Sequence, residues 1–321
     1  MSLGKKILLA KPRTYGGSLI MNILGWQVVR IFVFWVWRVM RTPKQVDPRY
    51  TREFAELSKR GAVMVPNFFP PADYAYIKSE FDRLKPLFEP DGTEIGIPHV
   101  DRMSIYDKRV PERFRSLILN AAMVRDVGRA YLNRDYHFPL HAYLTNVHIA
   151  GGEVGLPQNG GTNNLHMDVP ARVYKAFFYI DDVDEPNGAM RYAFGTHQHH
   201  ALWRLWFEYL LSVRYAWNRY HPDPLKEYRP GLPWVRITDE EEKHYRINPE
   251  PLRAKGNTMA LADVGAFHRR GVMTEAGERH TVEINFREVE TIRNNLFPLE
   301  KLTRKLLRLP PANFEKFKSA Q

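Results

Sequence analysis

The chain of 321 residues contains no cysteine. Disulfide frameworks and zinc–thiolate sites are therefore excluded, and any bound metal must be held by histidine and carboxylate side chains. The chain also lacks the composition of disordered proteins, which contain few hydrophobic residues, since 44% of its residues are hydrophobic and 13% are aromatic. A chain of this size can bury a sizeable core in one large domain or two small ones.

Acidic residues are missing from positions 1–46, which carry eight basic residues. Residues 301–321 hold six basic residues against Glu315. The net charge of +11 therefore lies at the two ends of the chain, and residues 47–300 are close to neutral. Basic ends on a near-neutral body are not typical of a nucleic-acid groove, and they favour contact with an anionic membrane surface.

Residues 19–37 form a long apolar run that contains one charged residue, Arg30. An Arg near the bilayer centre costs about 2.5–3.5 kcal/mol, which argues against a simple membrane span. The run is also too long and too aromatic for a signal peptide. We expect residues 1–46 to form a basic, apolar arm whose helix lies in a membrane interface. A span, or a helix packed on the protein's own body, is the alternative.

Residues 47–290 are expected to form an α+β domain, followed by a basic amphipathic tail at 291–321. Helices are predicted at 50–59, 72–84 and 121–132, and strands at 61–66, 137–149, 172–180, 257–262 and 279–287. Short strands with Gly, Pro and Asn breaks predict a double-stranded β-helix, the jelly-roll or cupin-like fold, with flanking helices.

An aromatic-rich insertion at 199–250 interrupts these strands, and its first half is predicted to be helical. Its aromatic residues include Trp203, Trp206, Phe207, Tyr209, Tyr215, Trp217 and Tyr220. Three roles stay open: a lid over an apolar substrate, a surface layer that buries its own aromatic side chains, or a continuation of the membrane-facing surface.

His166 and Asp168 are two positions apart, so on an extended backbone their side chains point to the same side. With a distant histidine they form the 2-His-1-carboxylate facial triad of non-haem Fe(II) oxygenases, which leaves the other metal positions open. We take His268 as the third metal ligand. Arg279 follows eleven residues later and offers a planar fork for a co-substrate carboxylate.

Several segments, in the right order, resemble the phytanoyl-CoA dioxygenase family of Fe(II)/2-oxoglutarate-dependent oxygenases. Gly61–Pro71 resembles the family's opening strand, turn and helix, and Asn164–Asp168 resembles its HxD motif. Ile180–Met190 with Phe194–His197 resembles the family's turn. Gly265–His268 resembles the segment of the distal metal ligand, and Arg279 resembles the 2-oxoglutarate anchor. The similarity covers about 60–290. Phe194 and Thr196 depart from it, because Pro and Ser are usual at these two positions.

The resemblance implies Fe(II), 2-oxoglutarate and O2 as cofactors, with His166, Asp168 and His268 as ligands and Arg279 on the distal carboxylate of 2-oxoglutarate. The implied reaction couples decarboxylation of 2-oxoglutarate to succinate and CO2 with oxidation of a substrate. A carboxylate at Asp168 favours hydroxylation or another oxidation over halogenation. The apolar arm and the insertion favour an apolar or lipid-like small molecule as substrate.

Residues on the same strand faces are further candidates for contact with 2-oxoglutarate or substrate. Thr281 shares a face with Arg279, Tyr143 shares one with Thr145, and Lys175 shares one with Phe177 and Tyr179.

Competing assignments exist. His280, and the cluster His197, His199 and His200, compete with His268, and Arg269, Arg270 and Arg287 compete with Arg279. The functional rivals are an oxygenase of a soluble natural product and a membrane-tethered metal-binding β-roll without turnover. We expect a cytoplasmic location at a membrane surface and no nucleic-acid partner, and the sequence does not indicate an oligomeric state.

Overall fold

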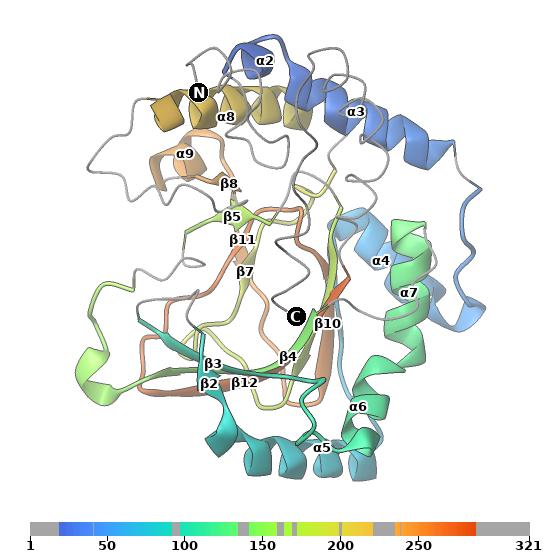
Figure 1. Ribbon diagram of the computed structural model, residues 1–321, viewed down its shortest axis with the longest axis vertical. Helices are drawn as coiled ribbons and strands as arrows, with labels where there is room; N and C mark the ends of the chain where they lie inside the picture. The colour runs from blue at the N-terminus through green and yellow to red at the C-terminus, as the bar shows by residue number, and fades with distance from the viewer. Residues whose placement is uncertain are drawn as a thin grey trace, which may run out of the picture. The chain divides into compact units, whose positions relative to one another are not determined.

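Two antiparallel β-sheets form the centre of the protein (Figure 1). The computed structural model describes residues 19–40, 42–91, 97–133, 141–158, 164–168, 172–198, 201–220, 235–237 and 239–286. All of these belong to one compact unit, residues 1–286. The predicted tail at 291–321 lies outside the described residues.

The larger sheet has seven strands in the order β1-β10-β6-β12-β4-β3-β2. Their bounds are β1 Ala62–Val65, β2 Glu89–Pro90, β3 His99–Ser104, β4 His141–Ile149, β6 Tyr174–Tyr179, β10 Thr258–Asp263 and β12 Gly277–Phe286. The smaller sheet has five short strands in the order β8-β5-β11-β7-β9. These are β5 His166–Met167, β7 Arg191–Tyr192, β8 Val235–Arg236, β9 Glu250–Pro251 and β11 His268–Arg269.

Four helices cover one face of the larger sheet: α4 Thr51–Arg60, α5 Pro71–Leu84, α6 Glu112–Leu119 and α7 Ala122–Leu132 (Figure 1). Short 3₁₀ helices lie at Pro48–Tyr50, Lys85–Leu87 and Gly151–Glu153. The main hydrophobic core fills the space between these helices and the sheet. It contains Leu144, Phe178 and Val282 from the strands, and Phe81 and Phe114 from the helices.

The opposite face of the larger sheet carries polar side chains, because successive residues of a strand point to opposite faces. One row of cross-strand partners runs through Thr258, Tyr179, Thr281, Thr145 and Arg102. This polar face is turned toward the smaller sheet. The space between the two sheets is therefore lined by polar side chains, whereas the space between the larger sheet and the helices is apolar.

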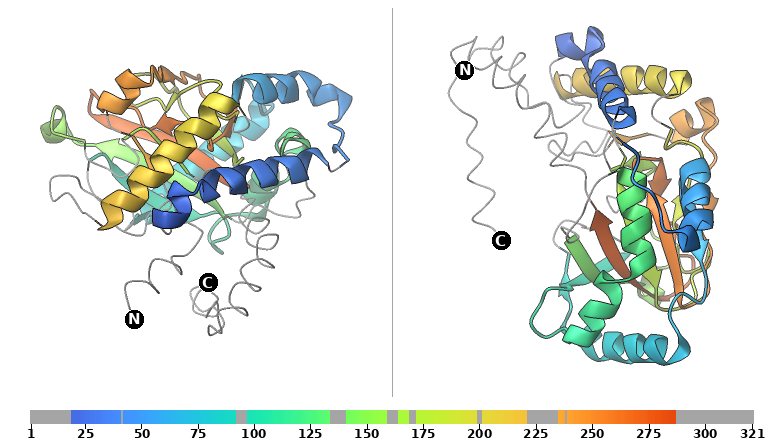
Figure 2. Two further views of the ribbon diagram at one scale, coloured as in Figure 1. Left: turned by 90° about the horizontal axis from the view of Figure 1, so that it is seen from above. Right: turned by 90° about the vertical axis from the view of Figure 1, so that its right-hand side faces the viewer.

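The N-terminal helices α2, Leu19–Ile23, and α3, Trp26–Val39, lie beside helix α8, Leu202–Tyr220, of the insertion (Figure 2). The Asn22 side chain donates a hydrogen bond of 3.0 Å to the Ser212 carbonyl. A second insertion helix, α9, spans Asp239–His244. Within the described parts of the chain, no helix is both long enough and apolar enough to span a bilayer.

The mixed arrangement of helices and antiparallel sheets agrees with the predicted α+β class. The predicted helices and strands of the body are present with ends shifted by a few residues, and residues 137–140 and 287 lie outside the described part. Helices α6 and α9, strand β3 and the two-residue strands, which include the whole smaller sheet, were not predicted. All of these elements are short, and β3 lacks a clear alternation of apolar and polar residues.

Gly128 lets helix α7 approach the larger sheet closely, since a Cβ at this position would lie 2.6 Å from the Tyr174 ring. We therefore expect Gly128→Ala to lower the free energy of unfolding by about 1–3 kcal/mol, although Ala is normally the better helix former. Gly152→Ala is the control, because its Cβ would meet no atom within 4 Å. Urea unfolding of both variants measures the effect, and an equal response would contradict it.

Candidate metal centre

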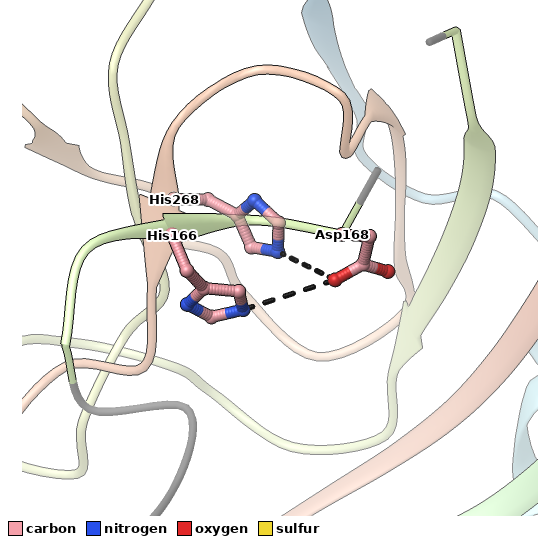
Figure 3. A group of neighbouring side chains, drawn as sticks. All are labelled: His166, Asp168 and His268. Atoms are coloured by element: carbon pink, nitrogen blue, oxygen red, sulfur yellow. Dashed lines mark ion pairs between the residues drawn. The ribbon is translucent and has the colours of Figure 1, made fainter. Parts of the chain in front are cut away.

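His166, Asp168 and His268 converge between the two sheets (Figure 3). Strand β5 supplies His166, and Asp168 follows it directly, while β11 supplies His268. The two histidines are direct cross-strand partners, which brings their ring centroids to 4.5 Å. The Asp168 Oδ1 lies 3.8 Å from the His166 Nε2 and 3.7 Å from the His268 Nε2. Residues a hundred positions apart therefore face a common centre.

Backbone carbonyls fix the orientation of both imidazole rings. The His166 Nδ1 lies 2.7 Å from the Asn164 carbonyl oxygen, and the His268 Nδ1 lies 3.0 Å from that of Ala266. An Nδ1–H that donates to a carbonyl leaves Nε2 as the acceptor nitrogen of the ring, and both Nε2 atoms are directed at the centre. Burial, reinforced by His268, lowers the pKa of His166 to about 3. Burial also lowers the pKa of His268. Both rings are therefore neutral at physiological pH, as metal ligands must be.

The Lys175 Nζ lies 2.7 Å from the Asp168 Oδ2, the carboxylate oxygen that is not directed at the histidines. Burial acts to raise the pKa of Asp168, but the neighbouring Lys175 and the two histidines outweigh it and hold that pKa below its usual value. The sequence led us to expect Lys175 on 2-oxoglutarate or substrate. The structure instead pairs it with the acidic member of the triad.

The buried carboxylate of Asp263 shapes the loop that leads to His268. Its Oδ1 accepts hydrogen bonds from the backbone N–H groups of Val173 at 3.0 Å and Gly265 at 2.9 Å. The Tyr131 hydroxyl donates to its Oδ2 at 2.6 Å. Three donors on one carboxylate hold the end of β10, the start of β6 and helix α7 together.

The larger sheet presents Arg279 and Thr281 toward the space between the sheets, on one face of β12 as predicted. Both are buried. Thr145 is the cross-strand partner of Thr281, and among the described residues its buried Oγ1 has no hydrogen-bond partner. Tyr143 lies on the same face, half-buried, with its hydroxyl 3.4 Å from the His141 Nδ1. This wall therefore offers a guanidinium and hydroxyl groups to a polar ligand.

The competing histidines have other contacts. His280 points to the opposite face of β12, where its Nδ1 lies 2.5 Å from Asp181 and its Nε2 lies 2.9 Å from Glu278. The His197 Nε2 lies 3.0 Å from the Ser58 carbonyl oxygen, away from the triad. His199 and His200 lie outside the described residues.

Among the competing arginines, Arg269 forms an ion pair of 3.0 Å with Glu242. Arg287 lies outside the described residues. Arg270 is buried and lies two positions after His268, so it remains an alternative to Arg279.

Three contacts at or behind the triad were missed from the sequence: Lys175 on Asp168, Asp263 in the ligand loop, and the buried ion pair of Arg204 with Glu208 on α8. The Arg204 and Glu208 pair has the four-residue spacing of a helical ion pair, but spacing alone does not reveal that both groups are buried. The other two contacts join residues far apart in the sequence.

The donor set fits Fe(II). Two imidazole nitrogens and one carboxylate oxygen lie within 4.8 Å of one another, and all three residues are buried. A site with two histidines and one carboxylate on one side, and open positions on the other, is the set that non-haem Fe(II) oxygenases use.

The sequence matches no family model and no curated protein. Solved structures share the fold. The epimerase SnoN in complex with Fe3+, alpha ketoglutarate and nogalamycin RO is 15% identical, with a TM-score of 0.50 over 74% of this chain and 84% of that one. A second SnoN structure, described as a non-heme alpha ketoglutarate dependent epimerase from nogalamycin biosynthesis, is 14% identical, with a TM-score of 0.50 over 74% and 83%. The fold is thus one that non-haem iron enzymes use, and the phytanoyl-CoA dioxygenase family stays a prediction.

The contact of Lys175 with Asp168 predicts how metal binding responds to pH. Because a lowered pKa keeps Asp168 ionised, Co(II) affinity in the wild type should change little between pH 7.5 and 5.5. In Lys175→Met, burial would raise the pKa of Asp168, so protons would compete with the metal at higher pH. Affinity should then fall by about tenfold for each unit of pH below that raised pKa.

Calorimetric titration with Co(II) across this pH range measures the effect. Lys255→Met is the matched control, because Lys255 pairs with the exposed Asp182 instead. Parallel pH profiles for the wild type and Lys175→Met would contradict the role given to Lys175.

Proposed function

We propose that this protein is an Fe(II)- and 2-oxoglutarate-dependent oxygenase that hydroxylates a small molecule. The observation that carries the proposal is the convergence of the His166 Nε2, the His268 Nε2 and the Asp168 Oδ1 between the sheets. The fold shared with solved non-haem iron enzymes supports the same reaction class.

His166 and His268 would bind the iron as neutral donors, and Asp168 would supply the single negative ligand. Lys175 would hold the second oxygen of Asp168, so that only Oδ1 is directed at the ion. When bound, iron and 2-oxoglutarate supply the oxidising chemistry, in which O2 is consumed and 2-oxoglutarate becomes succinate and CO2. The protein's share is to position these groups and to exclude water.

Arg279 would anchor the distal carboxylate of 2-oxoglutarate, because a planar guanidinium fixes the direction of a carboxylate as well as its charge. The hydroxyls of Thr281 and Thr145 would donate to the same carboxylate. The Thr145 Oγ1 supports this assignment because it has no hydrogen-bond partner among the described residues, and a buried hydroxyl in that state is costly unless a ligand satisfies it. Tyr143 would contact the substrate.

Anaerobic addition of Fe(II) and then 2-oxoglutarate should produce the weak visible charge-transfer band of the iron chelate. His166→Ala should abolish the band, because two ligands remain. Arg279→Lys should retain the band but need on the order of tenfold more 2-oxoglutarate or greater, since the bidentate contact is lost.

Arg269→Lys is the matched control, because Arg269 points outward to Glu242 and should leave the 2-oxoglutarate dependence unchanged. If Arg270→Lys raises the 2-oxoglutarate concentration needed for the band and Arg279→Lys does not, Arg270 is the residue that anchors 2-oxoglutarate. Absence of the band in folded wild-type protein would refute the oxygenase assignment. The remaining assignment would then be a metal-binding protein without turnover.

An exposed apolar surface supports action at a membrane. We call it the apolar surface; it comprises Ile20, Ile23, Leu24, Val29 and Phe32 from α2, α3 and the turn between them, and Leu202, Trp203, Trp206 and Trp217 from α8. Helices distant in sequence lie side by side here (Figure 2). The first 46 residues carry eight basic residues and no acidic one, which complements an anionic lipid surface. We propose that the protein docks there and takes a lipid-like substrate.

A second candidate is the oxidation of a soluble, polar natural product. The polar wall between the sheets favours it, because Glu283 and Asn285 lie on the same face of β12 as Arg279, and the buried Asn285 Oδ1 has no hydrogen-bond partner among the described residues. The SnoN structures come from nogalamycin biosynthesis. Turnover of a soluble substrate without vesicles would favour this candidate.

Membrane docking predicts that Trp206→Glu and Leu202→Glu weaken binding to phosphatidylserine-containing vesicles by about tenfold or more, since each places a charge in the apolar surface. Val272→Glu is the matched control, because Val272 is exposed to nearly the same extent as Trp206 but lies in the loop after β11. Vesicle co-sedimentation at low and high salt measures binding. If the three variants behave alike, or the wild type does not bind, the docking proposal is wrong.

A further inference from the structure

Arg204 of helix α8 is fully buried directly behind the strands that carry the metal ligands. Its guanidinium donates to the Thr196 carbonyl at 2.9 Å, to the Met167 Sδ at 3.1 Å and to the Gly265 carbonyl at 3.3 Å. It also lies over the Phe267 ring, 4.7 Å from the centroid. Glu208, one helical turn further on, accepts from Nε at 2.9 Å and from Nη2 at 2.7 Å.

These contacts fall on both segments that supply the triad. Met167 stands between His166 and Asp168, while Phe267 immediately precedes His268 and Gly265 lies three residues before it. Because side chains alternate along a strand, the ligands point inward and Met167 and Phe267 point outward to α8. One planar group therefore contacts the outer side of both ligand segments.

Thr196 extends the same set of contacts. Its Oγ1 accepts a hydrogen bond of 2.9 Å from the Phe267 N–H, the peptide next to His268. Its carbonyl oxygen accepts from Arg204. The backbone before His268 is thus held by Arg204 both directly and through Thr196.

Covering the smaller sheet does not by itself require a charged side chain. Elsewhere α8 covers it with Phe207 and Leu211, which are buried among Leu165, Met167 and Phe267. A buried ion pair is often no more stable than apolar residues of similar volume, so its presence points to a need for directional donors. Burial lowers the pKa of Arg204 to about 9, which leaves the guanidinium charged at neutral pH. Burial also raises the pKa of Glu208 well above its ordinary value, so the directional hydrogen bonds of the pair matter more here than its charges.

We propose that Arg204 is a positioning residue for the metal centre, and that helix α8 is the structural back of that centre rather than a lid over its mouth. This inference rests on the proposed function, because it requires a metal at the triad. The fork of Arg204 sets the positions of the two ligand segments relative to each other, and the Glu208 carboxylate holds the fork in place.

Co(II) titration of the full-length protein, followed by its visible absorption, tests this together with the melting temperature. Arg204→Lys keeps the charge but loses the fork. It should weaken Co(II) binding by about tenfold or more, as the loss of groups that orient metal ligands generally does. It should also change the Co(II) spectrum. Leu211→Ala is the control, because Leu211 lies on α8 about two turns further on and should lower the melting temperature while leaving the affinity within about twofold.

A second pair of variants decides the matter if Arg204→Lys does not fold. Thr196→Val removes the acceptor of the Phe267 N–H and should weaken Co(II) binding, whereas Thr196→Ser keeps the hydroxyl and should restore it. Unchanged affinity in Arg204→Lys and in Thr196→Val, or an equal loss in Leu211→Ala, would overturn the positioning role. Failure of the wild type to bind Co(II) would overturn the proposed function as well, so the two failures are distinguishable.

Discussion

The pairing of strand β5 with strand β11 is the contact on which the metal centre depends. It makes His166 and His268 direct partners, although about a hundred residues separate them in the sequence. Because side chains alternate along a strand, a slip of one residue in either strand would turn a ligand outward and an apolar residue inward. Each of these strands is only two residues long, so their own hydrogen bonds cannot fix the register.

The register is fixed instead from both sides of the smaller sheet. On the inner side, Lys175 of the larger sheet contacts Asp168, and Asp263 holds the loop before His268. On the outer side, helix α8 packs Phe207 against Phe267 and directs Arg204 at both ligand segments. Lys175, Asp263 and Arg204 thus surround the triad, and each of them contacts a specific partner in the surrounding framework.

Local patterns in the sequence predicted much of this arrangement. The i, i+2 spacing of His166 and Asp168 and the strand parity of Arg279 and Thr281 depend only on extended backbone, so they could be derived without a structure. The partners of Lys175 and Arg204 could not, because both depend on which distant segments come into contact. The role of the insertion was open for the same reason, since an aromatic helix has the same pattern whether it forms a lid, an outer layer or a membrane-facing surface.

The short strands of the smaller sheet also have a consequence for the order of folding. Closing the segment between His166 and His268 costs chain entropy before any contact in that sheet repays it. Most strands of the larger sheet are longer and are backed by the main hydrophobic core, so they can form without the smaller sheet. We therefore expect the metal ligands to meet late, after the larger sheet and its helices have formed, so that a nascent chain would acquire its fold before it acquires its chemistry.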